Sequence, residues 1–129
     1  MKTSELTGAA LDWAVAKCEG YECQFDDEVS GPWLISQEGY LNDEKPLSSM
    51  RCSTNWAQGG PIIEREEICL KRQLPCYVGY EWNAWIWTKH LPKGGSSAGG
   101  SGPTPLIAAM RCYVASKLGD EVEVPEELQ

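Results

Sequence analysis

Apolar residues recur at helical spacing near both ends of the chain. In residues 8–19 an apolar stripe follows Thr7, which stands at the position of a helix N-cap, and Gly20 stands at its end. A second stripe runs through residues 105–118 and follows Thr104. The pattern therefore predicts an N-terminal helix and a C-terminal helix.

Between these two stripes the pattern changes to short runs that are typical of strands. Residues 21–25, 32–36 and 82–87 read as strands, and the last run is the clearest because it is rich in aromatic and branched side chains. Residues 61–70 fit a strand that ends in a turn or contains a bulge, and residues 37–49 read as a polar loop. The sum is an α+β fold, in which a small antiparallel sheet packs with an N-terminal and a C-terminal helix.

Two segments near the C-terminus have a distinctive composition. Residues 93–103, "KGGSSAGGSGP", are typical of a flexible Gly/Ser-rich loop, either natural or engineered. Residues 120–129 form an acidic tail, in which Val122 and Val124 could add an edge strand. The length of 129 residues predicts a single domain over residues 1–129, and this domain includes the Gly/Ser-rich loop and the acidic tail.

The strand over residues 82–87 carries aromatic side chains on both of its faces. Trp82 and Ile86 share one face, while Trp85 and Trp87 share the other. Both faces must then be covered, which indicates a central strand or a contact between subunits. We therefore expect a homo-oligomer.

The net charge of −8 is unevenly distributed. Residues 1–44 have a balance of −8, residues 45–117 a balance of +5, and residues 118–129 a balance of −5. An acidic protein repels the phosphate backbone, so we expect no general nucleic-acid binding, although the basic middle segment could meet a small anion or simply pair with the acidic flanks. We expect no membrane span, because no apolar run is long enough, and no secretory signal, which places the protein in the cytoplasm.

Six cysteines and one histidine raise the question of a metal or catalytic site. No two cysteines form a C-x-x-C pair, and His90 has no partner at zinc spacing. We therefore expect reduced thiols, mostly buried, with no metal and no cofactor. The sequence also contains no nucleotide fingerprint, P-loop or nucleophile motif, so binding is favoured over catalysis.

The stretch "STNWAQGGP", residues 53–61, has the composition of a ligand-binding loop. Asn55 and Gln58 offer donors and acceptors, Trp56 offers a flat face for stacking, and Gly59 with Gly60 would leave backbone amides bare. The alternative is a structural Gly-Gly-Pro turn with Trp56 tucked into the core. The two interpretations remain open at this point.

The start of the C-terminal helix is a second candidate anion site. Gly102 would permit close approach, Thr104 adds a hydroxyl, and free amides with the helix dipole favour phosphate. The alternative is that Thr-Pro is simply a good helix start. The full set of candidate ligand-binding residues is Asn55, Trp56, Gln58, Gly59, Gly60, Arg65, Trp87, Gly102, Thr104 and Arg111.

Three long strings resemble the NinX family of tailed phages and prophages. They are "LTGAALDWAVAK", "STNWAQGGPIIERE" and "GPTPLIAAMRCYVASKLGDEVEVPEEL", which together cover roughly half of the chain. The resemblance implies a small phage accessory protein in the cytoplasm of an infected bacterium. It implies no particular activity.

Three hypotheses about function follow. The first is a non-enzymatic phage protein that binds a small nucleotide-derived anion and sequesters a host immune signalling nucleotide, by analogy with small α+β phage proteins of that kind. The second is an acidic protein-binding inhibitor or adaptor that acts on a host protein through its charged ends. The third is a nucleotide hydrolase.

Overall fold

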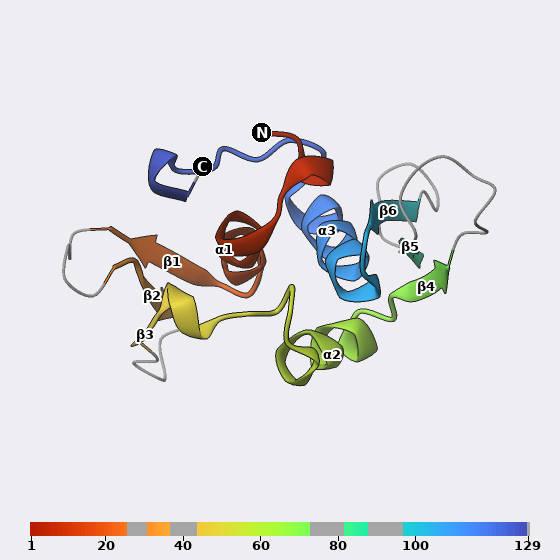
Figure 1. Ribbon diagram of the computed structural model, residues 1–129, viewed down its shortest axis with the longest axis horizontal. Coiled ribbons are helices and arrows are strands. Elements are labelled where there is room, and N and C mark those ends of the chain that lie inside the picture. The colour runs from red at the N-terminus through yellow and green to blue at the C-terminus, as the bar shows by residue number, and fades with distance from the viewer. Residues whose placement is uncertain (26–30, 37–43, 73–81, 88–96, 129) are drawn as a thin grey trace.

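The computed structural model describes residues 1–25, 31–36, 44–72, 82–87 and 97–128. Helices and strands follow one another along these ranges, as Figure 1 shows. In chain order the elements are η1 Thr3–Glu5, α1 Gly8–Cys18, β1 Tyr21–Gln24, β2 Trp33–Ser36, β3 Glu44–Pro46, η2 Leu47–Ser49, α2 Trp56–Arg65, β4 Cys69–Arg72, β5 Trp82–Trp87, β6 Ser97–Gly102, α3 Pro105–Leu118 and η3 Glu126–Leu128.

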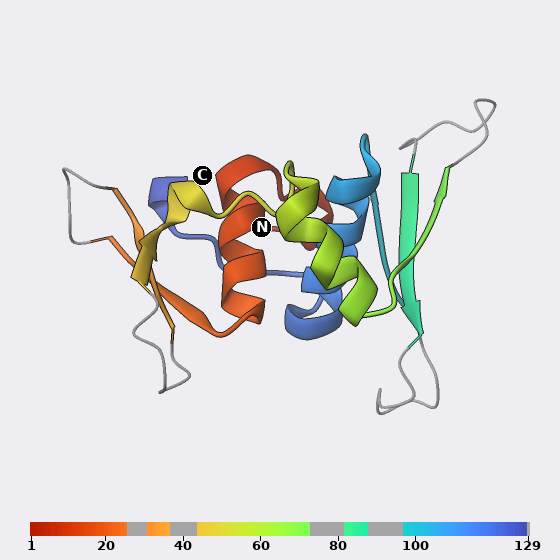
Figure 2. The same cartoon turned by 90° about the horizontal axis from the view of Figure 1, so that it is seen from below.

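The strands form two antiparallel sheets of three strands each, with the orders β1-β2-β3 and β4-β5-β6. Figure 2 shows one sheet at each end of the molecule, with the three α-helices between them. The α+β fold expected from the sequence is confirmed. The strands are divided between two sheets because the helical layer separates the first three from the last three. The predicted strand over residues 82–87 is β5, the central strand of its sheet.

Helix α3 lies at the centre of the core. It packs against β5 and β6 on one side and against α1 and α2 on others, so its residues from Ala108 to Val114 are all buried. Both helices predicted from the apolar stripes are confirmed. Thr104 accepts a capping hydrogen bond at the start of α3, and Gly119, with φ of +86°, follows its end. Thr7 occupies the N-cap position of α1 but makes no side-chain capping bond.

Residues 56–65 form α2, so the alternative of a structural turn at Gly59-Gly60-Pro61 and the predicted strand from residue 61 are wrong at this point. Asn55 caps the helix: its Oδ1 atom accepts the Ala57 N–H at 2.9 Å. Gly59 faces the segment that precedes α2. A Cβ atom on Gly59 would lie 2.5 Å from the carbonyl oxygen of Cys52 in that segment. Tertiary packing thus holds a helix in a segment whose glycines and proline favour a turn. Only the end of the predicted strand, at β4, is extended.

Residues 97–102 form strand β6, so the predicted flexible loop over residues 93–103 is wrong for this part. All six residues pair with β5, from Ser97 opposite Trp87 to Gly102 opposite Trp82. A Cβ atom on Gly100 would lie 2.5 Å from the backbone nitrogen of Cys112 in α3. The missing side chains therefore let the central helix approach the sheet. Residues 93–96 lie outside the described ranges.

The acidic tail packs against the N-terminal segment. Val122 and Val124 are buried, and the N-terminal amine donates to the Val122 carbonyl at 2.9 Å. The edge strand considered from the sequence is reduced to a single bridge between Lys2 and Glu121. Within the described ranges, no helix has the length and apolar character that crossing a membrane requires.

Candidate functional site

The segment that leads into α2 exposes one large aromatic side chain. Trp56 is 53% exposed at the first position of the helix. The Oε1 atom of Gln58 accepts the Arg51 N–H at 2.6 Å, and its Nε2 atom donates to the Ser49 carbonyl at 2.9 Å. The side chains of Asn55 and Gln58 thus hold the backbone in place, while Trp56 remains available to a ligand.

The start of α3 lies beside the start of α2. A hollow of about 200 Å³ between them is lined by Ser53, Thr54, Trp56, Thr104, Leu106 and Ile107, and we call it the helix-start hollow. The two candidate ligand sites predicted from the sequence thus share one hollow, to which the first contributes Trp56 and the second contributes Thr104. Sequence reasoning missed Ser53 and Thr54, whose only signal was the polar run that precedes Asn55.

The charge distribution around the helix-start hollow suits an anion. The Oγ1 atom of Thr104 accepts the Ile107 N–H at 3.1 Å, and the Oδ1 atom of Asn55 accepts the Ala57 N–H at 2.9 Å. Within the part of the chain that the structure describes, the first-turn amides of Trp56 and Leu106 have no acceptor. The positive ends of two helix dipoles therefore meet at one place, and first-turn amides are the usual donors to phosphate.

Ser53 is the most unusual residue in the lining of this hollow. It is 2% exposed, and its hydroxyl has no partner at hydrogen-bonding geometry within the described residues, although it lies close to the Asp12 carboxylate. Its backbone N–H donates to Asp12 Oδ1 at 2.9 Å. Burial raises the pKa of Asp12, while its contacts with Ser53 and the charge of Arg51 lower it in part. Asp12 itself is not one of the residues that line the hollow.

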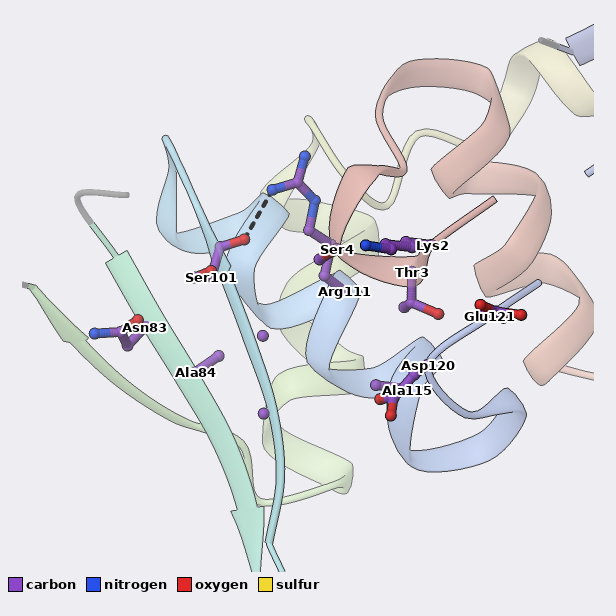
Figure 3. A pocket seen from close by; sticks show the side chains of 12 residues that line it. Lys2, Thr3, Ser4, Asn83, Ala84, Ser101, Arg111, Ala115, Asp120 and Glu121 are labelled. Atoms are coloured by element: carbon purple, nitrogen blue, oxygen red, sulfur yellow. Dashed lines mark hydrogen bonds between the residues drawn. The ribbon is translucent and has the colours of Figure 1, made fainter. Parts of the chain in front are cut away.

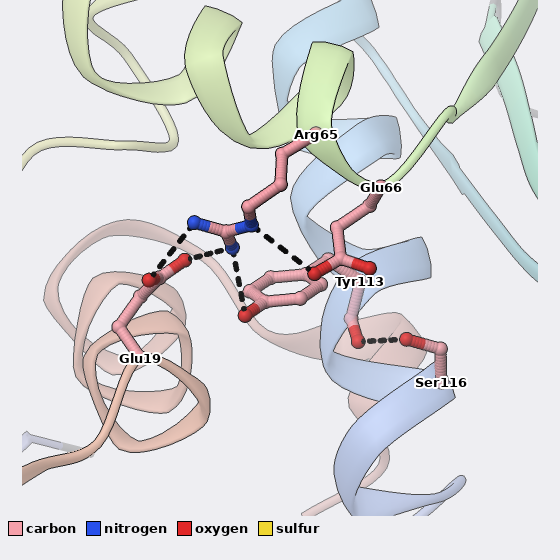
Figure 4. Close-up of polar contacts among 5 residues, drawn as sticks. All are labelled: Glu19, Arg65, Glu66, Tyr113 and Ser116. Carbon is pink, nitrogen blue, oxygen red and sulfur yellow. Dashed lines mark hydrogen bonds and ion pairs between the residues drawn. The ribbon is translucent and has the colours of Figure 1, made fainter.

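Arg65 lies at the opposite end of α2 from Trp56 and is engaged by protein groups. Its Nη2 atom lies 2.5 Å from Glu19 Oε1 and 3.2 Å from the Tyr113 hydroxyl, and its Nε atom lies 3.3 Å from Glu66 Oε1 (Figure 4). The hydrogen bond to Glu19 is the main cause of a raised pKa for Arg65. This cluster joins the ends of α1 and α2 to α3, so the structure gives Arg65 a place in helix packing, away from the helix-start hollow.

Gly102 and Arg111 lie near a second, larger hollow of about 540 Å³. Arg111 is 3% exposed, and its Nε atom donates to the Leu6 carbonyl at 2.9 Å. Its Nη1 atom donates to the Ser101 carbonyl at 2.8 Å, as Figure 3 shows. A Cβ atom on Gly102 would lie 2.9 Å from Ile107 Cγ2. Gly102 thus serves the packing of α3, and Arg111 holds backbone carbonyls from two segments.

A protein-family model described as bacteriophage P22, NinX, matches residues 2–117. The chain belongs to the NinX family. The resemblance seen in the sequence is confirmed, because the match contains the first two strings and the third as far as Lys117, and it also spans the segments between them. Among curated proteins, no significant match to the chain was found.

The remaining candidates from the sequence receive less support in this NinX-family protein. Gly59 faces Cys52 and Leu106, while a Cβ atom on Gly60 would meet nothing within 4 Å. The side chain of Trp87 lies outside the described residues, as does His90. In the described ranges, no group of three or more His, Cys, Asp or Glu residues could hold a metal ion.

The described cysteines of the NinX-family chain are free thiols in different surroundings. Cys52 and Cys112 are buried, Cys18 and Cys23 are half-buried, and Cys69 is exposed. Burial raises the pKa of Cys52 to about 11 and that of Cys112 to about 12. These buried thiols are therefore poor nucleophiles. Cys76 lies outside the described residues.

Proposed function

We propose that this NinX-family protein binds a small nucleotide-derived anion at the helix-start hollow, without turning it over. The observation that carries the proposal is the meeting of two helix N-termini beside Trp56, which is 53% exposed. Helix N-termini favour phosphate, and a base that stacks on an aromatic ring gains about 1–3 kcal/mol. Together they match the two parts of a nucleotide.

The size of the hollow fits one part of such a ligand. A volume of about 200 Å³ lies below the roughly 300–1,000 Å³ of pockets that enclose a whole small molecule. We propose that the phosphate enters the hollow, near the amides of Trp56 and Leu106, and that the Ser53 hydroxyl completes its hydrogen bonding there. The base then lies outside, against the exposed face of Trp56.

The family sets the biological context of the proposal. A protein of a phage family meets the nucleotides of an infected bacterium, so we propose the host cytoplasm as its place of action. In this setting the ligand is a signalling nucleotide made by host immunity, and binding sequesters it. Tight binding without catalysis is enough for that role, and no cofactor is needed.

A homo-oligomer is part of the same proposal. Ala84 and Ile86 in β5 are buried on one face of the sheet, whereas Trp85 on the other face is half-buried. We propose that a second copy covers this face. Light scattering that gives the mass of a monomer at high concentration would contradict it.

The test is thermal unfolding of the full chain against a panel of cyclic di- and trinucleotides, ADP-ribose with its cyclic forms, and mononucleotides. A ligand at 100 times its dissociation constant should stabilise the fold by about 2.7 kcal/mol, which shifts Tm by several degrees. The shift should disappear in Trp56→Ala and shrink in Ser53→Ala, since these substitutions remove the stacking face and the buried hydroxyl.

The controls separate binding from folding. Trp56→Phe keeps an aromatic face and should keep most of the shift. Asn55→Ser keeps a capping side chain and should behave as the wild type, whereas Asn55→Ala costs about 1 kcal/mol of stability with or without ligand. A panel without any shift, or an equal shift in Trp56→Ala, would overturn the proposal.

A further inference from the structure

Strand β6 presents a bare backbone at the edge of its sheet. Among the described strands it lies at the end of the order β4-β5-β6, and its sequence, "SAGGSG", has no side chain larger than serine. Edge strands of natural proteins usually carry charged side chains, prolines or bulges that block pairing with another chain. None of the side chains of residues 97–102 provides such a block.

The orientation of the β6 backbone leaves polar groups directed away from β5. The Ser101 carbonyl accepts a hydrogen bond from Arg111 Nη1, so this carbonyl points away from the partner strand. In an antiparallel pair every second residue has the same orientation, so the N–H and C=O groups of Gly99 also point outward. Gly99 is exposed. An incoming strand can therefore bond to it.

The larger hollow lies along this edge. Its volume is about 540 Å³, and Gly99, Gly100 and Ser101 line it on the side of the sheet. Lys2, Ser4, Asp120 and Glu121 line it on the side of the two terminal segments, as Figure 3 shows. A strand added to a sheet lies about 4.8 Å from its neighbour, which would place it in this space.

We propose that β6 binds an extended, basic peptide segment of a partner protein, which adds to the sheet as a fourth strand. Main-chain hydrogen bonds to Gly99 would supply affinity, as in other cases of strand addition. The hollow is lined by the cations Lys2 and Arg111 as well as by the carboxylates of Asp120 and Glu121. A lysine or arginine of the peptide would bind beside the two carboxylates, and the net charge of −8 of the whole chain attracts such a partner. A second copy of this chain that paired through its own β6 is a poorer occupant, because that strand carries no basic side chain for Asp120 and Glu121.

The test is binding of a short fluorescein-labelled peptide of alternating lysine and valine to the full chain, followed by fluorescence anisotropy. Gly99→Pro removes the outward N–H and should weaken binding by about tenfold, the effect of one lost main-chain hydrogen bond. Its matched control, Gly99→Ala, keeps the N–H, and a Cβ atom there would lie 3.6 Å from the Ala84 carbonyl oxygen, an ordinary contact. Gly99→Ala should therefore bind as the wild type does.

Two further measurements keep the proposal falsifiable if Gly99→Pro does not fold. The double variant Asp120→Asn, Glu121→Gln should weaken binding and reduce its salt dependence. The same peptide with methylated backbone nitrogens keeps its charges but cannot donate main-chain hydrogen bonds, so it should not bind. Absence of binding by the unmodified peptide, or equal binding of the methylated one, would overturn the proposal. A dimer that Gly99→Pro dissociates, without peptide binding, would assign the edge to a second copy instead.

Discussion

The Oδ1 atom of Asp12 accepts a hydrogen bond of 2.9 Å from the backbone N–H of Ser53. Both residues are buried, with 7% and 2% exposure, and the bond ties α1 to the segment that leads into α2. The helix-start hollow owes its position to this link, because Ser53 and Thr54 belong to that segment. Burial of the carboxylate raises the pKa of Asp12, so the link is formed against a desolvation cost.

The first prediction separates the hydrogen bond of Asp12 from its charge. Asp12→Ala should destabilise the protein by about 1–3 kcal/mol, because it leaves the buried Ser53 N–H without an acceptor. Asp12→Asn keeps an acceptor oxygen and removes the charge, so it should be neutral or stabilising at pH 7. Urea unfolding of the three proteins checks this.

The pH dependence of the same variants supplies the control. The pKa of Asp12 is raised in the folded state, so folding favours the protonated form. The stability of the wild type relative to Asp12→Asn should be highest below about pH 4, the unfolded pKa of Asp, and should fall as the pH rises through the folded pKa. If the difference in stability between the wild type and Asp12→Asn did not change with pH, it would contradict a raised pKa for Asp12 in the folded state.

The second prediction uses the two adjacent glycines of α2. Gly59→Ala would place a Cβ atom 2.5 Å from both the Cys52 carbonyl oxygen and Leu106 Cδ1, so it should destabilise by about 1–3 kcal/mol. A Cβ atom on Gly60 would meet nothing within 4 Å, so Gly60→Ala should stabilise α2, and with it the protein, by about 0.5–1 kcal/mol. Chemical denaturation measures both. Equal effects of the two substitutions would argue against a helix that packs through Gly59.

These glycines also show why the sequence predicted some elements and not others. Helices α1 and α3 carry their own apolar stripes, and Gly20 and Gly119 stand just beyond their ends, so local patterns were sufficient. Helix α2 depends on contacts that the local sequence does not reveal, such as the bond between Gln58 and Ser49. Its glycines and proline favour a turn when they are considered alone.

The same reason explains the partial prediction of the candidate site and of β6. Trp56 and Thr104 were each identified from local composition, but that they share one hollow follows from the packing of α2 on α3. Strand β6 has the composition of a linker, and only its pairing with β5 and the approach of Cys112 to Gly100 explain its glycines. Composition does not distinguish a glycine that is mobile from one that is closely packed.

The third prediction concerns the ion pair between Arg65 and Glu19. The Arg65 side chain is 50% exposed, and the ion pair with Glu19 is therefore weak although the two side chains lie close together. Loss of this ion pair in Arg65→Ala should lower the free energy of unfolding by only about 0.5–1 kcal/mol. Glu19→Gln should cost a similar amount, and the double variant should cost less than the sum, because each substitution removes the same contact. A double-mutant cycle at low and high salt measures this coupling. Full additivity of the two costs, or a coupling that salt does not weaken, would contradict an exposed electrostatic pair.

The fourth prediction concerns the reactivity of the thiols. Cys69 is exposed, whereas Cys112 is buried and has a pKa of about 12, so at pH 8 almost none of Cys112 is the reactive thiolate. A thiol reagent added to the native protein should therefore modify Cys69 first and Cys112 only after unfolding, as peptide mass spectrometry would show. Labelling in urea, where both residues should react, is the control. If Cys112 reacted in the native protein as fast as Cys69, the contact between α3 and β6 would have to open readily, because Cys112 lies against Gly100 in that contact.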